Sequence, residues 1–184
     1  MMKTYKILLS FFLILISGLG FSQSVPYYVP TNGLVGWWGF NGNAQDGSGN
    51  GNHGTVNGAT LTTDRFGNQN GAYSFDGVDD YATVSSLNLT GITENFTFIT
   101  VIKFPTFNNS GVIVWQAFSS YWALMTNTSF GAANLTFTTR GTRGQAAVSS
   151  TLTANQWYYV VCKREAGVNS LYINNTIYTY TSDV

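Results

Sequence analysis

Short stretches of apolar and polar residues that alternate with a period of two recur along the chain, which is the spacing of β-strands with one buried face. The longest such stretch, residues 96–103, is apolar on much of both faces and is expected to lie in the middle of a sheet. No stretch beyond the first 22 residues has a convincing helical period. The other expected strands and hairpins lie at 34–40, 55–63, 72–75, 81–84, 112–117 with 121–126, 133–139 with 145–149, 157–163 with 170–174, and 176–181. About a dozen short strands separated by turns predict an all-β fold, an antiparallel β-sandwich or jelly roll.

The most distinctive polar feature is an acidic turn at residues 76–80. Asp76-Gly77 signals a tight turn, because Gly accepts positive φ and Asp can bond to its own backbone. Asp79 and Asp80 follow at the entrance of the strand 81–84. Adjacent carboxylates repel, so a site that keeps both gives them hydrogen bonds, a cation or open water. Asp79 and Asp80 are therefore either a hard-cation or structural hydrogen-bond site, or part of a solvated acidic turn.

A loop of Gly, Asn, Asp and Ser at residues 41–52 offers a second set of oxygen ligands. Asp46, Ser48 and Asn50 place side-chain oxygens at alternate positions, as in the first half of a helix–loop–helix calcium site. The last ligand of that motif should be Glu, but Asn57 stands there and no flanking helix is expected. Two alternatives remain: a simpler calcium site made by loop oxygens, or a loop tied down by Asx turns.

The first residues predict a secretory signal peptide, residues 1–22. Lys3 and Lys6 give a positive start, an apolar run follows at 7–16, and small residues precede an expected cleavage after Ser22. The apolar run is too short for a comfortable membrane span. We therefore expect a secreted or cell-surface protein with no membrane span once the signal peptide is removed.

Composition excludes several classes of partner. The chain has 8 basic and 8 acidic residues and a formal net charge of +0, so nothing indicates nucleic acid or an anionic membrane surface. The single cysteine, Cys162, cannot form an internal disulfide and lies in an apolar strand, where a buried small hydrophobe is expected. A catalytic thiol would need a base, and the only histidine, His53, lies in a distant loop.

Carbohydrate binding is one candidate chemistry, because aromatic faces cover the apolar side of a sugar ring and planar polar groups bind its hydroxyls. The candidate contacts lie in or beside the expected hairpins: Trp115, Tyr121, Trp122, Arg140 and Arg143. The alternative for the aromatic residues is the core, since a β-sandwich with 5 Trp must bury most of them.

Glycoside hydrolysis is not expected in this chain. It needs two carboxyl groups facing each other across a cleft. The only glutamates, Glu94 and Glu165, lie before a strand and in a turn, and adjacent Asp79 and Asp80 should point to opposite faces of a strand. Catalytic residues are therefore predicted to be absent.

Three ordered motifs resemble the LamG-like jelly-roll domains of the concanavalin A-like lectin/glucanase superfamily. They are Ala72-Tyr73-Ser74-Phe75-Asp76-Gly77-Val78-Asp79-Asp80-Tyr81, the run from Leu34 to Thr55, and Asn155-Gln156-Trp157-Tyr158-Tyr159-Val160-Val161 followed by Leu171-Tyr172-Ile173-Asn174. The resemblance implies an extended lead-in at 23–33 and one LamG-like domain at 34–184. It also implies that the chain is a fragment of a longer secreted bacterial protein, lacking the last strands of the jelly roll. Several LamG-like domains bind calcium.

These observations together favour a secreted, non-catalytic recognition or adhesion module. Its expected partner is carbohydrate or an extracellular protein, with calcium as a structural cofactor. Two alternatives remain open, since one fold hosts many functions. One is an accessory carbohydrate-binding domain of a secreted glycoside hydrolase whose catalytic part lies elsewhere, and the other is a structural spacer of a large surface adhesin.

Overall fold

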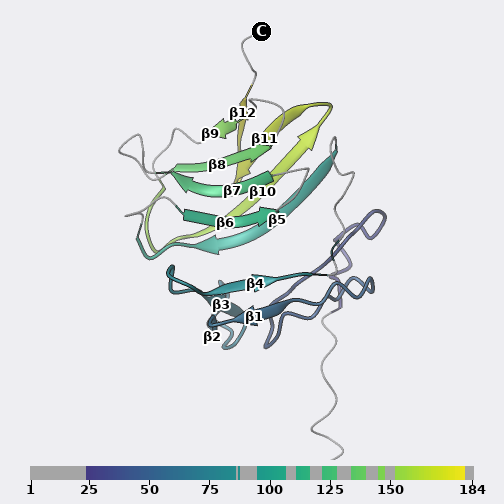
Figure 1. Ribbon diagram of the computed structural model, residues 1–184, viewed down its shortest axis with the longest axis vertical. Helices are drawn as coiled ribbons and strands as arrows, with labels where there is room; N and C mark the ends of the chain where they lie inside the picture. Colours follow the sequence, from purple (N-terminus) through teal and green to yellow (C-terminus); the bar gives the residue numbers. More distant parts are fainter. Residues whose placement is uncertain are drawn as a thin grey trace, which may run out of the picture. The chain divides into compact units, whose positions relative to one another are not determined.

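Every regular element in the described part of the chain is a β-strand, as the period-two pattern predicts (Figure 1). The computed structural model describes residues 24–85, 87, 95–106, 111–116, 122–127, 134–139, 145–147 and 152–180. The predicted signal peptide at 1–22 lies outside these residues. Within them, no helix has the length and apolar character needed to cross a membrane.

The strands are short in the first half of the chain and longer in the second. Their bounds are β1 (Thr55–Asn57), β2 (Thr60–Thr62), β3 (Ala72–Ser74), β4 (Tyr81–Thr83), β5 (Phe96–Lys103), β6 (Gly111–Gln116), β7 (Trp122–Asn127), β8 (Asn134–Thr139), β9 (Gln145–Ala147), β10 (Trp157–Glu165), β11 (Val168–Ile173) and β12 (Thr176–Tyr180). The chain divides into two compact units, Met1–Leu87 and Asn88–Val184. We call them the first and second unit and describe each by itself.

The second unit consists of two antiparallel sheets of four strands each, in the orders β12-β11-β10-β5 and β6-β7-β8-β9. The predicted pairings of consecutive strands in this unit are confirmed. One detail differs from expectation: β5 lies at the edge of its described sheet rather than in the middle. Ile99, on the face of β5 that points away from the core, is 52% accessible.

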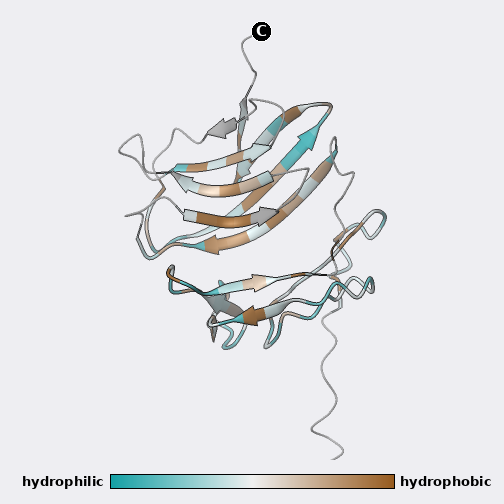
Figure 2. Cartoon of the chain, viewed as in Figure 1, coloured by the Kyte–Doolittle hydropathy of each residue, from teal (hydrophilic) through white to brown (hydrophobic). Residues whose placement is uncertain are grey.

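Side chains from both sheets meet in one hydrophobic core. Leu124 and Phe137 come from one sheet, Val160 and Leu171 from the other, and all four are 0% exposed. Figure 2 shows the hydrophobic stretches along β5 and β6. Cys162 belongs to the same core, and burial raises the pKa of its thiol to about 12, which confirms the prediction of a structural cysteine.

A polar cluster is buried within this unit beside the apolar core. Arg164 of β10 is 8% exposed, and its Nη1 donates to Oγ1 of Thr139 at 3.0 Å and to Oδ1 of Asn169 at 2.9 Å. Nδ2 of Asn169 also donates to Oγ1 of Thr139, at 3.1 Å. The cluster joins β8 of one sheet to β10 and β11 of the other. Removing any member would leave buried polar groups without these partners.

The first unit departs from the predicted hairpin at residues 55–63. β1 and β2 do not pair with each other: β1 pairs with β4, and β2 pairs with β3. Gly58 between them has φ +77, and a Cβ at this position would collide with Oδ1 of Asp80. The glycine therefore allows the chain to pass close to the acidic turn.

Residues 34–40, a predicted strand, form no regular strand. Both backbone groups of Trp37 bond to the loop that follows: its N–H donates to Oδ1 of Asp46 at 2.9 Å, and its carbonyl accepts from the N–H of Gly47 at 2.8 Å. The extended segment is thus held by a loop rather than by a neighbouring strand.

We expect Phe137→Ala to lower the free energy of unfolding by about 3–5 kcal/mol, because it removes a fully buried ring from the centre of the core. Urea denaturation followed by circular dichroism measures this change. Val112→Ala is the matched control, since Val112 is 61% exposed on β6 and should cost less than about 0.5 kcal/mol. Equal losses in the two variants would contradict this description of the core.

Candidate functional site

The loop at residues 41–52 is organised around the carboxylate of Asp46, which is 7% exposed. Its Oδ1 accepts from the N–H of Trp37 and of Ser48 at 2.9 and 2.8 Å. Its Oδ2 accepts from Oγ of Ser48 at 2.8 Å and from the N–H of Asn52 at 2.9 Å. A carboxylate has about four acceptor positions, so these four donors occupy the capacity of Asp46.

The other two predicted ligands of this loop are engaged in the same network. Oγ of Ser48 accepts from the N–H and from Nδ2 of Asn50, at 3.3 and 3.1 Å. Nδ2 of Asn50 also donates to the carbonyl of Leu34 at 2.8 Å. The contacts match the second of the two alternatives that the sequence left open, a loop tied down by Asx turns. Calcium at this loop stays a prediction.

The electrostatics of Asp46 follow from these contacts. Burial acts to raise the pKa of its carboxyl, but the donors from Trp37, Ser48 and Asn52 outweigh burial and lower the pKa from 3.8 to about 2. His53 contributes as an acceptor, since its Nδ1 takes the N–H of Asp46 at 3.1 Å. The only histidine of the chain thus directly follows the loop and bonds to it.

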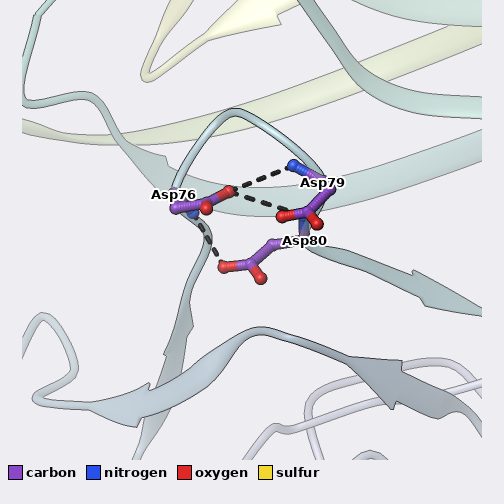
Figure 3. Close-up of side chains that lie close together, drawn as sticks. All are labelled: Asp76, Asp79 and Asp80. Atoms are coloured by element: carbon purple, nitrogen blue, oxygen red, sulfur yellow. Dashed lines mark hydrogen bonds between the residues drawn. The ribbon is translucent and has the colours of Figure 1, made fainter.

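The acidic turn brings three carboxylates together (Figure 3). Oxygen atoms of Asp76, Asp79 and Asp80 lie within 4.8 Å of one another. Oδ1 of Asp76 accepts from the N–H groups of Val78, Asp79 and Asp80 at 2.8, 3.3 and 3.4 Å, and Oδ2 of Asp80 accepts from the N–H of Asp76 at 2.9 Å. The N–H of Val78, helped by the other two, lowers the pKa of Asp76.

The sequence predicted Asp79 and Asp80 as a pair but missed Asp76 as a third member of the set. The reason is the backbone of the turn: Gly77 has φ +77 and folds the chain back, so that Asp76 faces the residues that follow it. The spacing Asp-x-x-Asp-Asp around a glycine is the signal that could have found it. The remaining oxygens of the three carboxylates accept no hydrogen bond that the structure describes. Carboxylate oxygens of this kind suit a hard cation.

The structure describes only some of the residues that were predicted to contact sugar. Trp122 is 7% exposed and packs in the core with ring centroids 5.3 and 5.4 Å from those of Phe96 and Phe98, so the structure gives it the core position that was its alternative. Trp115 is a residue of β6. Tyr121, Arg140 and Arg143 lie outside the described residues.

The described residues contain no pair of carboxylates arranged for hydrolysis. Glu165 is exposed and forms an ion pair with Lys163, with 2.6 Å between Oε2 and Nζ. The three aspartates of the acidic turn lie side by side in one exposed turn rather than on two elements that face each other. Glu94 lies outside the described residues.

Two antiparallel sheets around one apolar core make the second unit a β-sandwich of the jelly-roll, lectin-like class. Comparison with protein families is consistent with this class. The family described as Clostridium neurotoxin, N-terminal receptor binding, matches residues 41–183, and the chain belongs to this family. The match spans both units. Comparisons with curated proteins and with solved structures found no match.

The family assignment confirms the predicted concanavalin A-like jelly roll and the absence of an enzymatic role. The narrower resemblance to LamG-like domains stays a prediction.

The pKa of Asp46 predicts how stability depends on pH. A carboxyl whose pKa is lowered in the folded state stabilises it fully above its ordinary pKa, 3.8, and loses that contribution as the pH falls through about 2. The contribution is about 2 kcal/mol. We therefore expect Asp46→Asn to be less stable than wild type at pH 6 by about this amount, and the difference to shrink by pH 2.

Urea denaturation at both pH values measures this difference. Asp79→Asn is the control, because the carboxylate of Asp79 is exposed and accepts no hydrogen bond that the structure describes. A stability difference between Asp46→Asn and wild type that is the same at pH 6 and at pH 2 would show that the charge of Asp46 does not hold the loop.

Proposed function

We propose that this protein is a secreted recognition module that binds carbohydrate on a cell surface. The observation that carries the proposal is the family match over residues 41–183, because the family is described as receptor binding. An extracellular protein is the alternative receptor. Membership of a receptor-binding family also supports export, and the signal peptide predicted at 1–22 would supply the route.

The physical character of the chain supports carbohydrate over a strongly charged receptor. Charged residues make up only 9% of the chain and aromatic residues 16%. Sugar rings bind through stacking on aromatic faces and through hydrogen bonds to a few polar groups. The motifs that resemble LamG-like domains support the same proposal, because lectin-like domains are common in that superfamily.

A glycan array incubated with the chain lacking its first 22 residues tests this function. We expect saturable binding to at least one class of oligosaccharide, competed by the same oligosaccharide free in solution. Protein that has been heat-denatured before incubation is the control for binding by unfolded chain. An array without any specific signal, together with capture of an extracellular protein domain, would replace carbohydrate by protein as the receptor.

We also propose that calcium binds at the acidic turn and stabilises the first unit. The clustering of Asp76, Asp79 and Asp80 within 4.8 Å supports this choice of site over the Asp46 loop, where hydrogen bonds already occupy the carboxylate. Oxygen ligands of this kind in extracellular modules bind calcium with Kd of about 10⁻⁴–10⁻³ M.

Addition of 10 mM calcium, roughly ten to a hundred times this Kd, should stabilise the protein by about 1–3 kcal/mol. Thermal melts with and without calcium measure this shift, and Asp79→Asn should abolish it. Asp64→Asn is the matched control, since Asp64 also caps an exposed turn, accepting the N–H of Phe66 at 2.8 Å, but lies outside the cluster. A melting temperature that calcium leaves unchanged would refute the site.

A further inference from the structure

The first unit contains five Asn-Gly pairs, which are sites of a spontaneous covalent rearrangement. In this reaction the backbone nitrogen of the glycine attacks the side-chain carbonyl carbon of the asparagine, and glycine favours the attack because it has no Cβ to shield its nitrogen. The sequence alone does not distinguish the five pairs: Asn32-Gly33, Asn41-Gly42, Asn50-Gly51, Asn57-Gly58 and Asn70-Gly71.

The reaction needs no co-reactant except water. The glycine N–H loses its proton, the nitrogen bonds to Cγ of the asparagine, and the Cγ–Nδ2 bond breaks to release ammonia. Water then opens the resulting cyclic imide at one of its two carbonyl carbons, which leaves aspartate or isoaspartate. A folded protein therefore slows the reaction wherever hydrogen bonds hold the glycine nitrogen or the asparagine amide in place.

The side-chain amide of Asn50 is held in this way. Its Nδ2 donates to the carbonyls of Leu34 and Val35 at 2.8 and 3.2 Å and to Oγ of Ser48 at 3.1 Å. The amide cannot turn towards the nitrogen of the next residue until all three bonds are broken. Local opening of the loop at residues 41–52 must therefore precede the reaction at Asn50.

Two further pairs are held through their backbone. The N–H of Gly42 donates to the carbonyls of Phe40 and Asn70 at 3.0 and 2.8 Å, so its nitrogen is already engaged. The carbonyl of Asn70 belongs to the same peptide unit as the nitrogen of Gly71. One hydrogen bond thus restrains both Asn41-Gly42 and Asn70-Gly71.

The pair in β1 is restrained by its neighbours. Asn57 lies opposite Tyr81 of β4 in the ladder. A Cβ on Gly58 would collide with Oδ1 of Asp80, so a carboxylate lies directly against this glycine. The negative charge opposes removal of the proton from the glycine N–H, because like charges close together disfavour ionisation.

Asn32-Gly33 has none of these restraints. Both residues are exposed, and they are the central residues of a turn closed by the N–H of Leu34, which donates to the carbonyl of Thr31 at 3.1 Å. In the described part of the chain, neither the amide of Asn32 nor the N–H of Gly33 forms a hydrogen bond. Gly33 has φ +76, and no atom outside its chain neighbours lies within 4 Å of the position that a Cβ would occupy.

We propose that Asn32 is a self-modification site, which converts to aspartate and isoaspartate in the folded protein ahead of the other four asparagines. Either product adds one negative charge to the turn. Isoaspartate also routes the main chain through the former side chain, which lengthens the turn and removes the bond between Leu34 and Thr31. The modification therefore alters the joint between the predicted lead-in at 23–33 and the rest of the first unit.

Peptide mapping by mass spectrometry, combined with enzymatic methylation of isoaspartate, tests the proposal on purified protein stored at pH 7 and pH 9. We expect products at Asn32 to accumulate at least about tenfold faster than at Asn50, because only Asn50 requires local opening. The rate at Asn32 should be higher at pH 9, since the deprotonated nitrogen is the attacking group. Asn32→Gln should abolish the products at this position, because the longer side chain closes its ring far more slowly.

Two comparisons isolate the effect of the fold. In urea, all five pairs should react at rates within severalfold of one another, since the glycine that follows each asparagine then decides the rate. Asp46→Asn, which loosens the loop, should speed the reaction at Asn50 and leave Asn32 unchanged. If this variant fails to fold by circular dichroism, the comparison in urea carries the test. Equal rates at Asn32 and Asn50 in the folded protein, or a rate at Asn32 that rises at least tenfold in urea, would overturn the proposal.

Discussion

The register of β10 is the constraint on which the second unit depends. Its inward residues alternate with outward ones, so that Val160 and Cys162 are fully buried while Tyr159 is exposed. A slip of one residue against β5 or β11 would bring Lys163 into the core. Arg164 reinforces the register because its guanidinium group meets Thr139 and Asn169 only when β10 is correctly aligned. The same register places Trp157 and Tyr159 on the opposite face.

Much of the second unit could be predicted from the sequence, because its strands are long enough for period-two alternation to identify them. The hairpins β6–β7, β8–β9 and β10–β11 are examples. The position of β5 could not be predicted, since an apolar strand can be central or can lie at an edge with an exposed face. In the first unit, strands of three residues carry too little pattern, and long-range pairing of β1 with β4 overrode the Asn57-Gly58 turn signal.

The candidate sites show the same division between local and long-range information. Asp79 and Asp80 were found from their adjacency, whereas Asp76 joins them only through the fold of the turn. Trp122 was a candidate ligand because it is aromatic, but the sequence could not show that Phe96 and Phe98 cover it. The Asn-Gly pairs look alike in the sequence, and contacts with Leu34 and Val35, which are distant in the chain, distinguish Asn50 from Asn32.

The two units are held together internally by different forces, and this difference has a thermodynamic consequence. Among the described residues of the first unit, only Ala44 and Asp46 are buried, and the network around Asp46 consists of hydrogen bonds to one charge. The heat capacity change of unfolding arises from apolar surface newly exposed to water. The first unit therefore contributes little to that change for its length. The free energy of unfolding of the first unit should therefore change gently with temperature. The free energy of unfolding of the apolar second unit should follow a strongly curved profile.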